Sequence, residues 1–134
     1  MDVDKIKCEL LIFDCEPDVV SQLLKLEPTQ IIKVGDVKRK DPNGVNPPLL
    51  EERNIWVWST NIDTESIEEH IDAMFLVFKP KSAELSKLSA KYPIELSIYG
   101  NTIQSQIGIH LEKQWIKKLA DFGVELDVDI YSLA

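Results

Sequence analysis

Two aspartates and two histidines are the residues of this chain whose types and spacing best suit acid/base chemistry. Asp127 and Asp129 stand two apart in a segment with strand-like alternation, so their carboxylates share one face. A hard metal ion or a general acid/base pair would require such an arrangement, but the spacing alone is common. His70 and His110 belong to no motif that pairs a base with a nucleophile, and we expect His70 on the surface. We therefore interpret the aspartates as a solvated strand face, and we expect no catalytic residue and no metal site. The pattern favours a protein that is not an enzyme.

A basic cluster beside a glycine could bind an anion. It consists of Lys33, Lys38, Arg39 and Lys40, with Asp36 among them. Gly35 and Gly44 are isolated, and the chain has none of the glycine-rich patterns that hold phosphates or dinucleotides, so we expect no cofactor. A charged loop of this kind is most often solvated. The alternative is that Lys33, Lys38 or Arg39 meets an anionic ligand.

Length and charge restrict the class of protein. The chain has 134 residues, which is near the commonest size of a single domain, and we expect one domain over residues 1–134. Its formal net charge of -8 argues against nucleic acid or an anionic membrane as a partner, because both reward positive charge. A basic partner is compatible with this charge.

Apolar runs and cysteines predict a cytoplasmic protein. No apolar run approaches the roughly 20 residues that span a bilayer, and residues 1–7 are charged where a secretory signal would turn apolar. Cys8 and Cys15 stand at the two ends of one predicted strand, which separates them by about 23 Å. A disulfide needs Cα atoms closer than about 7 Å, so we expect two free thiols.

Hydrophobic periods and turn residues predict an α+β fold. We expect a two-layer sandwich in which about six strands form a mixed or mostly antiparallel sheet and three to four helices pack on one face. Residues 94–99 and 103–109 should form a hairpin around Gly100-Asn101. The remaining strands are expected at 6–13, 30–34, 54–60 and 124–131, the helices at 14–26, 63–79, around 85–92 and at 112–122, and a long loop or flap at 36–52.

Strand alternation separates an apolar face from a face that stays free for a partner. The free face is expected to present Tyr99, Gln104, Gln106, His110, Asp127, Asp129 and Tyr131. Residues 55–58 are apolar on both faces, so one set must be covered by the flap, by a second protomer or by a ligand. Trp56 and Trp58 are therefore either buried under the flap or anchors for an external partner, a role in which tryptophan is frequent.

Several of these segments together carry a family resemblance. They are Leu26-Glu27-Pro28-Thr29, then Gly35-Asp36, then the strand with Trp56, and the ending that runs from Leu119 to Tyr131. The pattern resembles a bacterial family catalogued as domain of unknown function 4279, and it covers nearly the whole chain. The resemblance implies no reaction, ligand or catalytic residue. Some members are similar to small acidic immunity proteins that accompany bacterial toxins.

Two functional hypotheses follow. The first is a non-catalytic protein-binding module whose free sheet face, centred on Tyr99, His110, Asp127 and Tyr131, docks a basic toxin or a second copy of the chain. The second is a small-molecule sensor or enzyme that binds an anion in a cleft between the flap and Trp56. Both depend on the last helix covering the sheet, with Trp115, Leu119 and Phe122 buried beneath it.

Overall fold

A five-stranded mixed sheet forms the body of the protein, whose computed structural model describes residues 6–134. Its strands lie in the order β2-β5-β1-β6-β7, so β1 is central and β2 and β7 are the edges. β1 is antiparallel to both of its neighbours, and β7 runs parallel to β6. The strands span Ile6–Phe13 (β1), Gln30–Ile32 (β2), Ile55–Ser59 (β5), Ile94–Thr102 (β6) and Glu125–Ser132 (β7).

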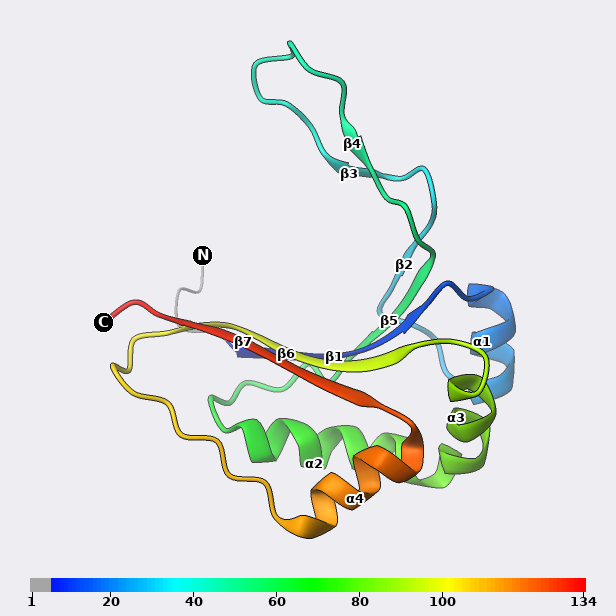
Figure 1. The fold of residues 1–134 in the computed structure, drawn as a ribbon, viewed down its shortest axis with the longest axis vertical. Coiled ribbons are helices and arrows are strands. Elements are labelled where there is room, and N and C mark those ends of the chain that lie inside the picture. The colour runs from blue at the N-terminus through cyan, green and yellow to red at the C-terminus, as the bar shows by residue number, and fades with distance from the viewer. Residues whose placement is uncertain (1–5) are drawn as a thin grey trace.

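Helices cover one face of this sheet and make the second layer, which confirms the expected α+β architecture (Figure 1). The helix caps follow local sequence. Ser66 accepts a hydrogen bond from the Glu69 backbone N–H, and Gly123 takes the left-handed conformation with φ 71°. A Cβ at Gly123 would collide with Ser89, so glycine is needed there. The helices are α1 (Pro17–Leu24), α2 (Ile67–Phe78), the 3-10 turn η1 (Lys79–Lys81), α3 (Ser82–Ser89) and α4 (Lys113–Phe122).

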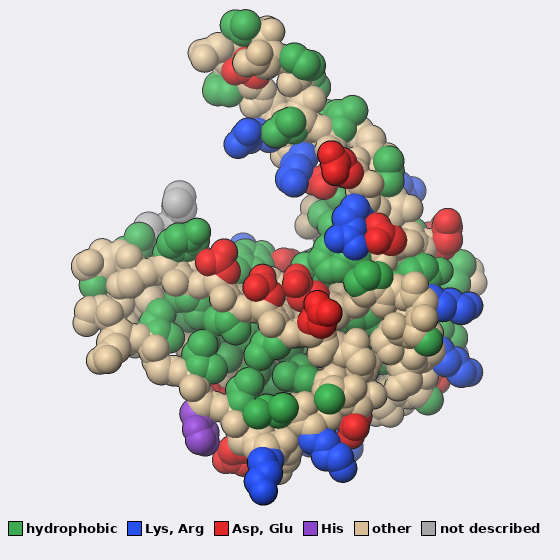
Figure 2. Space-filling view, viewed as in Figure 1, with side chains coloured by type: hydrophobic (Ala, Val, Ile, Leu, Met, Phe, Trp, Pro, Cys, Tyr) green, Lys and Arg blue, Asp and Glu red, His purple; other side chains and the backbone are tan. Residues whose placement is uncertain are grey.

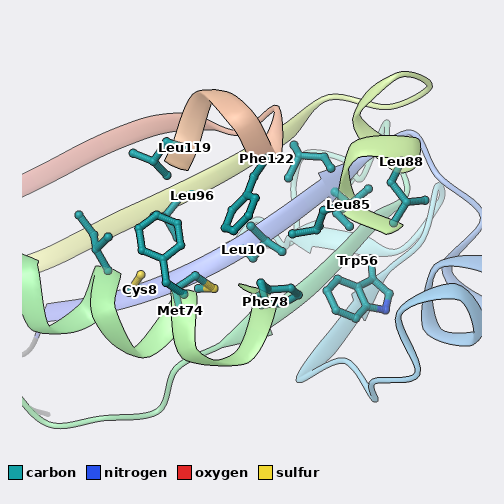
Figure 3. Packing of buried hydrophobic residues seen from close by; sticks show 14 of the residues in the cluster. Cys8, Leu10, Trp56, Met74, Phe78, Leu85, Leu88, Leu96, Leu119 and Phe122 are labelled. Carbon is teal, nitrogen blue, oxygen red and sulfur yellow. The ribbon is translucent and has the colours of Figure 1, made fainter. Parts of the chain in front are cut away.

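The core lies between the sheet and the helices, where strand and helix side chains interdigitate (Figure 3). Leu119 and Phe122 of α4 are buried as expected, while Trp115 is half-buried and stacks on Phe75 with ring centroids 5.1 Å apart. Both cysteines are free, as predicted, and the structure shows that both are buried. Burial raises the pKa of the Cys8 thiol to about 12, so this thiol stays protonated at neutral pH.

The segment predicted as a long loop or flap is an arm that projects away from the body (Figure 1). β3 (Val37–Arg39) and β4 (Leu49–Leu50) pair in antiparallel fashion and make a separate two-stranded sheet. Leu49 and Leu50 do not pin this segment to the body, because each is about half exposed. The arm therefore does not cover the sheet as a flap would.

The predicted hairpin around Gly100-Asn101 is wrong. β6 continues through both residues to Thr102, because Gly100 pairs with Ile6 on one side and Ile130 on the other. Two neighbouring strands hold this stretch extended and override its turn propensity. Residues 103–112 contain no strand and run as an irregular segment to α4.

Candidate protein-binding surface

The second face of the sheet carries no helix, and the surface that it forms is called the open face here (Figure 1). Strand register assigns each side chain to one face or the other, because neighbouring residues along a strand point in opposite directions. On β1 the buried residues are Ile6, Cys8, Leu10 and Ile12. The open face is accordingly built from Lys7, Glu9, Leu11 and Phe13 of β1, Gln30 and Ile32 of β2, Ile55, Val57 and Ser59 of β5, Glu95, Ser97, Tyr99 and Asn101 of β6, and Glu125, Asp127, Asp129 and Tyr131 of β7.

Four carboxylates form an acidic ridge along the β6–β7 side of the open face: Glu95, Glu125, Asp127 and Asp129. Glu95 lies directly beside Glu125 in the parallel register, and Asp127 and Asp129 follow along β7. Figure 2 shows acidic side chains gathered in a row along this part of the body, below the overhanging arm. Partial burial raises the pKa of Glu95, and the charges of Asp127 and Glu125 raise it further. The ridge is therefore a region of concentrated negative potential.

Two tyrosines flank the ridge. Tyr131 near the end of β7 is 65% exposed, so its ring is available to a partner. Tyr99 on β6 is half-buried, and its burial together with the neighbouring Glu9 raises the pKa of its phenol to about 12. Tyr99 therefore keeps its proton at neutral pH and can donate a hydrogen bond. A hollow of about 340 Å³ adjoins Tyr99 between β1 and the end of β5.

The opposite part of the open face is apolar and meets the root of the arm. Phe13 lies under the Arg53 guanidinium, which is 4.4 Å from the ring centroid. Arg53 also bridges to Asp14 at 2.8 Å, and its hydrogen bonds lower the pKa of that carboxyl. A hollow of about 360 Å³ lies beside Phe13 and Ile55 and is closed on the arm side by Lys38, Leu49 and Leu50 and by residues 51–53.

The arm itself combines exposed cations with exposed apolar side chains. Lys38 and Arg39 lie on β3, Lys40 follows directly after it, and all three are exposed. Its apolar residues are at least half exposed: Val37, Val45, Leu49 and Leu50. The tip is shaped by Asp41, whose carboxylate accepts hydrogen bonds from the backbone N–H groups of residues 43, 45 and 46. These bonds lower the pKa of Asp41 and hold the tip in one conformation.

Trp56 and Trp58 lie on the face of the sheet that the helices cover. They are therefore neither buried under the flap nor exposed as anchors for an external partner, and both expectations are corrected. In the register Trp56 pairs with Ile12 and Trp58 with Leu10, so both indoles point into the helical layer. Trp56 is fully buried, and its indole N–H donates to the Ser21 hydroxyl of α1 at 3.0 Å. Trp58 meets Phe78 edge to face. The residues that cover Trp56 are therefore helical, and the predicted cleft between the flap and Trp56 does not form.

The two histidines also differ from their predicted positions. His110 lies in the irregular segment after β6, where its backbone N–H donates to Glu68 of α2, and it is not on the open face. Side-chain hydrogen bonds hold this segment in place of a strand ladder, as when Gln104 donates to Glu65. His70 is fully buried, with Nε2 2.9 Å from the Thr64 carbonyl oxygen. The sequence signal for its burial was its place in the apolar stripe of α2.

The basic cluster is spread along the arm instead of lining one site. Asp36 accepts a hydrogen bond from the Lys33 backbone N–H at 2.8 Å and closes the turn at the root of the arm. Gly35 stands in that turn with φ 92°, a conformation that glycine adopts easily. Lys33 and Arg39 are both exposed and lie on different parts of the segment.

Of the predicted binding residues, the structure brings together Tyr99, Asp127, Asp129 and Tyr131 on the open face. Glu95 and Glu125 lie on the same face, because they alternate in step with these residues along β6 and β7.

Metal-binding groups and other hollows complete the description of the surface. Residues 6–134 contain no group of three or more His, Cys, Asp or Glu that could hold a metal ion. Over the same range no helix is long and apolar enough to cross a membrane. On the helical side, a shallow groove between α2 and α4 is lined by Phe75, Leu76 and Trp115, with Lys79 and Lys118 at its rim.

Fold and surface together define a two-layer α+β protein in which one sheet face stays open, acidic along one side and overhung by an arm that carries three consecutive exposed cations. The chain matches the family model described as Domain of unknown function (DUF4279) over residues 4–133, and it belongs to that family. No curated protein and no solved structure matches it.

Proposed function

We propose that this protein is a non-catalytic protein-binding module, and that its open face and arm together receive a basic segment of another protein. The observation that carries this proposal is the acidic ridge on a sheet face without helices. Neighbouring like charges on a sheet destabilise it, and the pKa of Glu95 is raised first by its burial and then by the charges of Asp127 and Glu125. Cationic side chains of a partner would relieve this repulsion on binding.

The shape of the surface supports a protein segment as the ligand. The ridge lies beside an apolar area with Phe13 and Ile55, and the arm overhangs both (Figure 2). Interfaces of proteins commonly combine an apolar centre with a polar or charged rim. An acidic ridge would also accelerate the encounter with a basic partner, because complementary charge raises association rates.

A basic toxin is the partner class that the net charge of -8 favours. Small acidic immunity proteins neutralise toxins by such complementary surfaces, and this comparison rests on likeness of charge and size. The proposal places the protein in the cytoplasm, where two reduced thiols such as Cys8 and Cys15 are stable.

A small-molecule anion sensor is the second candidate. It would use the hollow of about 360 Å³ at the root of the arm, with Lys38 and Arg53 as the cationic groups. Glu51 and Glu52 line the same hollow, and Arg53 is already paired with Asp14, so this hollow favours an anion less than the ridge favours a cation. A thermal shift with anionic metabolites tests this candidate, because a ligand of the native state raises the melting temperature.

Affinity capture from the source cell tests the principal proposal. Tagged wild-type protein should retain a basic protein, and the variant Asp127→Lys/Tyr131→Ala should lose it. The matched control is Asp121→Lys, which reverses an exposed carboxylate on α4, away from the open face, and should retain the same protein. Equal capture by the wild type and the double variant would contradict the proposal, as would no capture at all.

A further inference from the structure

We infer that, until a basic partner protein binds, the open face is occupied by a second copy of this chain, and that the two copies exchange arms across their acidic ridges. This inference rests on the proposed function, since it names the basic segment that the open face receives. The arm supplies that segment with three consecutive cations, Lys38 and Arg39 on β3 and Lys40 directly after it. Each copy would contribute one arm and one ridge, so the same contact would form twice about a two-fold axis.

Complementary charge identifies the second copy as the occupant. The ridge carries four carboxylates, Glu95, Glu125, Asp127 and Asp129, and the arm carries three cations in a row. The arm also carries carboxylates: that of Asp41 at the tip is engaged with three backbone N–H groups, and Asp36, Glu51 and Glu52 lie at its root, outside the stretch with the three cations. Figure 2 shows Lys and Arg side chains on the side of the arm that overhangs the body.

The root of the arm and the ridge lie on different sides of the sheet. The arm leaves the sheet between β2 and β5, whereas the ridge lies on β6 and β7 at the other side of the sheet. Two to four strand spacings separate the two, which is about 9–19 Å. Within residues 6–134, no ion pair joins the arm cations to the ridge carboxylates. In the proposed dimer, a second copy related by a two-fold axis would place its arm over this ridge.

Exposed apolar side chains on the arm also favour binding to a partner. An isolated two-stranded hairpin is marginally stable in water, so an ordered arm of this kind needs a surface to pack on. Val37, Leu49 and Leu50 are each about half exposed, and Val45 is 80% exposed. The open face offers the ring of Tyr131, which is 65% exposed, next to the ridge. Arm exchange would cover both sets of apolar groups together with the charges.

A charge-swap experiment tests the exchange. The arm-reversed variant is Lys38→Glu/Arg39→Glu/Lys40→Glu, and the ridge-reversed variant is Glu125→Lys/Asp127→Lys/Asp129→Lys. Sedimentation equilibrium should find a wild-type dimer, and each variant alone should dimerise at least about 100-fold more weakly, because its arm and ridge carry like charges. An equimolar mixture should recover the dimer, since each arm then meets a ridge of opposite sign in both contacts of the pair.

A matched control separates this contact from general charge effects. The variant Lys87→Glu/Lys113→Glu/Lys117→Glu makes the same change in net charge as the arm-reversed variant, but at exposed positions of α3 and α4, and it should remain dimeric. Circular dichroism checks that every variant is folded.

The inference fails if the wild type is monomeric, if the arm-reversed variant stays a dimer, or if the mixture stays monomeric. A monomeric wild type that still captures a basic protein through Asp127 overturns the arm exchange and leaves the proposed function standing. A dimer insensitive to both reversals, without Asp127-dependent capture, overturns both.

Discussion

The two faces of the central sheet come from the same strands and the same alternation, yet they differ in what they contribute. Along β1, Cys8, Leu10 and Ile12 are buried against helices, while Glu9 and Leu11 between them remain partly exposed. Apolar burial on the covered face stabilises the fold. The open face instead accumulates like charges that oppose it. Alternation thus assigns a side chain to a face, and the covering layer decides whether that face contributes stability or binding.

The largest expected effect is the loss of a buried side chain on the covered face. Trp56→Ala should lower the free energy of unfolding by about 3–5 kcal/mol, because it removes a fully buried aromatic and its hydrogen bond to Ser21. Urea denaturation measures this change. Tyr131→Ala on the open face is the control and should cost about 0.5 kcal/mol or less. Equal costs at the two positions would remove the distinction between the faces.

A half-buried aromatic of the helical layer should rank second. Trp115 stacks on Phe75 and carries Lys118 4.7 Å above its ring, but it lies at the rim of the α2–α4 groove. Trp115→Ala should cost about 2 kcal/mol, since the stacked pair adds roughly 0.5–1.5 kcal/mol to a partial burial. The same denaturation series compares it with Trp56→Ala. A larger loss at Trp115 than at Trp56 would show that α4, not α1, dominates the covered face.

Excision of the arm should have a small effect on the body. Replacing residues 37–50 by Asn-Gly removes β3 and β4, and the backbone hydrogen bond between Gly35 and Glu51 below the cut can persist. The free energy of unfolding of the monomer should change by about 1 kcal/mol or less, because the excised segment lies outside the core. A denaturation midpoint far below that of the wild type would show that the arm helps to stabilise the sheet.

The smallest expected effect concerns pH and the acidic ridge. The pKa of Glu95 is raised in the folded state, so the folded protein binds this proton more tightly than the unfolded chain does. Stability from this group is therefore present at low pH and is lost as pH rises through the raised pKa. Glu95→Gln should stabilise the protein slightly at neutral pH and flatten that part of the pH profile.

An NMR titration of the Glu95 side chain measures the cause directly. Its midpoint should lie above the ordinary glutamate value in the wild type and should move downward in Asp127→Asn, which removes one of the neighbouring charges. The matched control is Asp121→Asn on α4, which should leave the midpoint where it is. If Asp127→Asn also left it in place, burial and the charge of Glu125 would account for the raised pKa without Asp127.

Most elements of the fold could be predicted from the sequence because their signals are local. The apolar stripe of α2, the cap at Gly123 and the alternation in β7 all correspond to observed elements. Gly100-Asn101 is the exception: its preference for a turn is local, but two neighbouring strands hold it extended. The extended conformation of Gly100-Asn101 is decided by strands that are distant in sequence, and local turn propensity contains no information about them.

The candidate site was predictable only in part, for a related reason. Asp127, Asp129 and Tyr131 could be assigned to one face from their alternation, and the structure places them there. Residues 55–58 are apolar on both faces, so alternation could not show that Trp56 and Trp58 face the helices. The projection of the arm also left no periodic signal, since its strands are only two or three residues long.

The central position of β1 has a consequence for synthesis on the ribosome. β1 precedes both of its partners, and β5 and β6 emerge only much later in translation. Until then the nascent chain holds an apolar strand with two unpaired edges, a species prone to aggregation that chaperones protect. Folding must wait for pairings between distant segments, which are slow to form. A ribosome that stops before β6 would therefore release an aggregating fragment instead of a smaller stable domain.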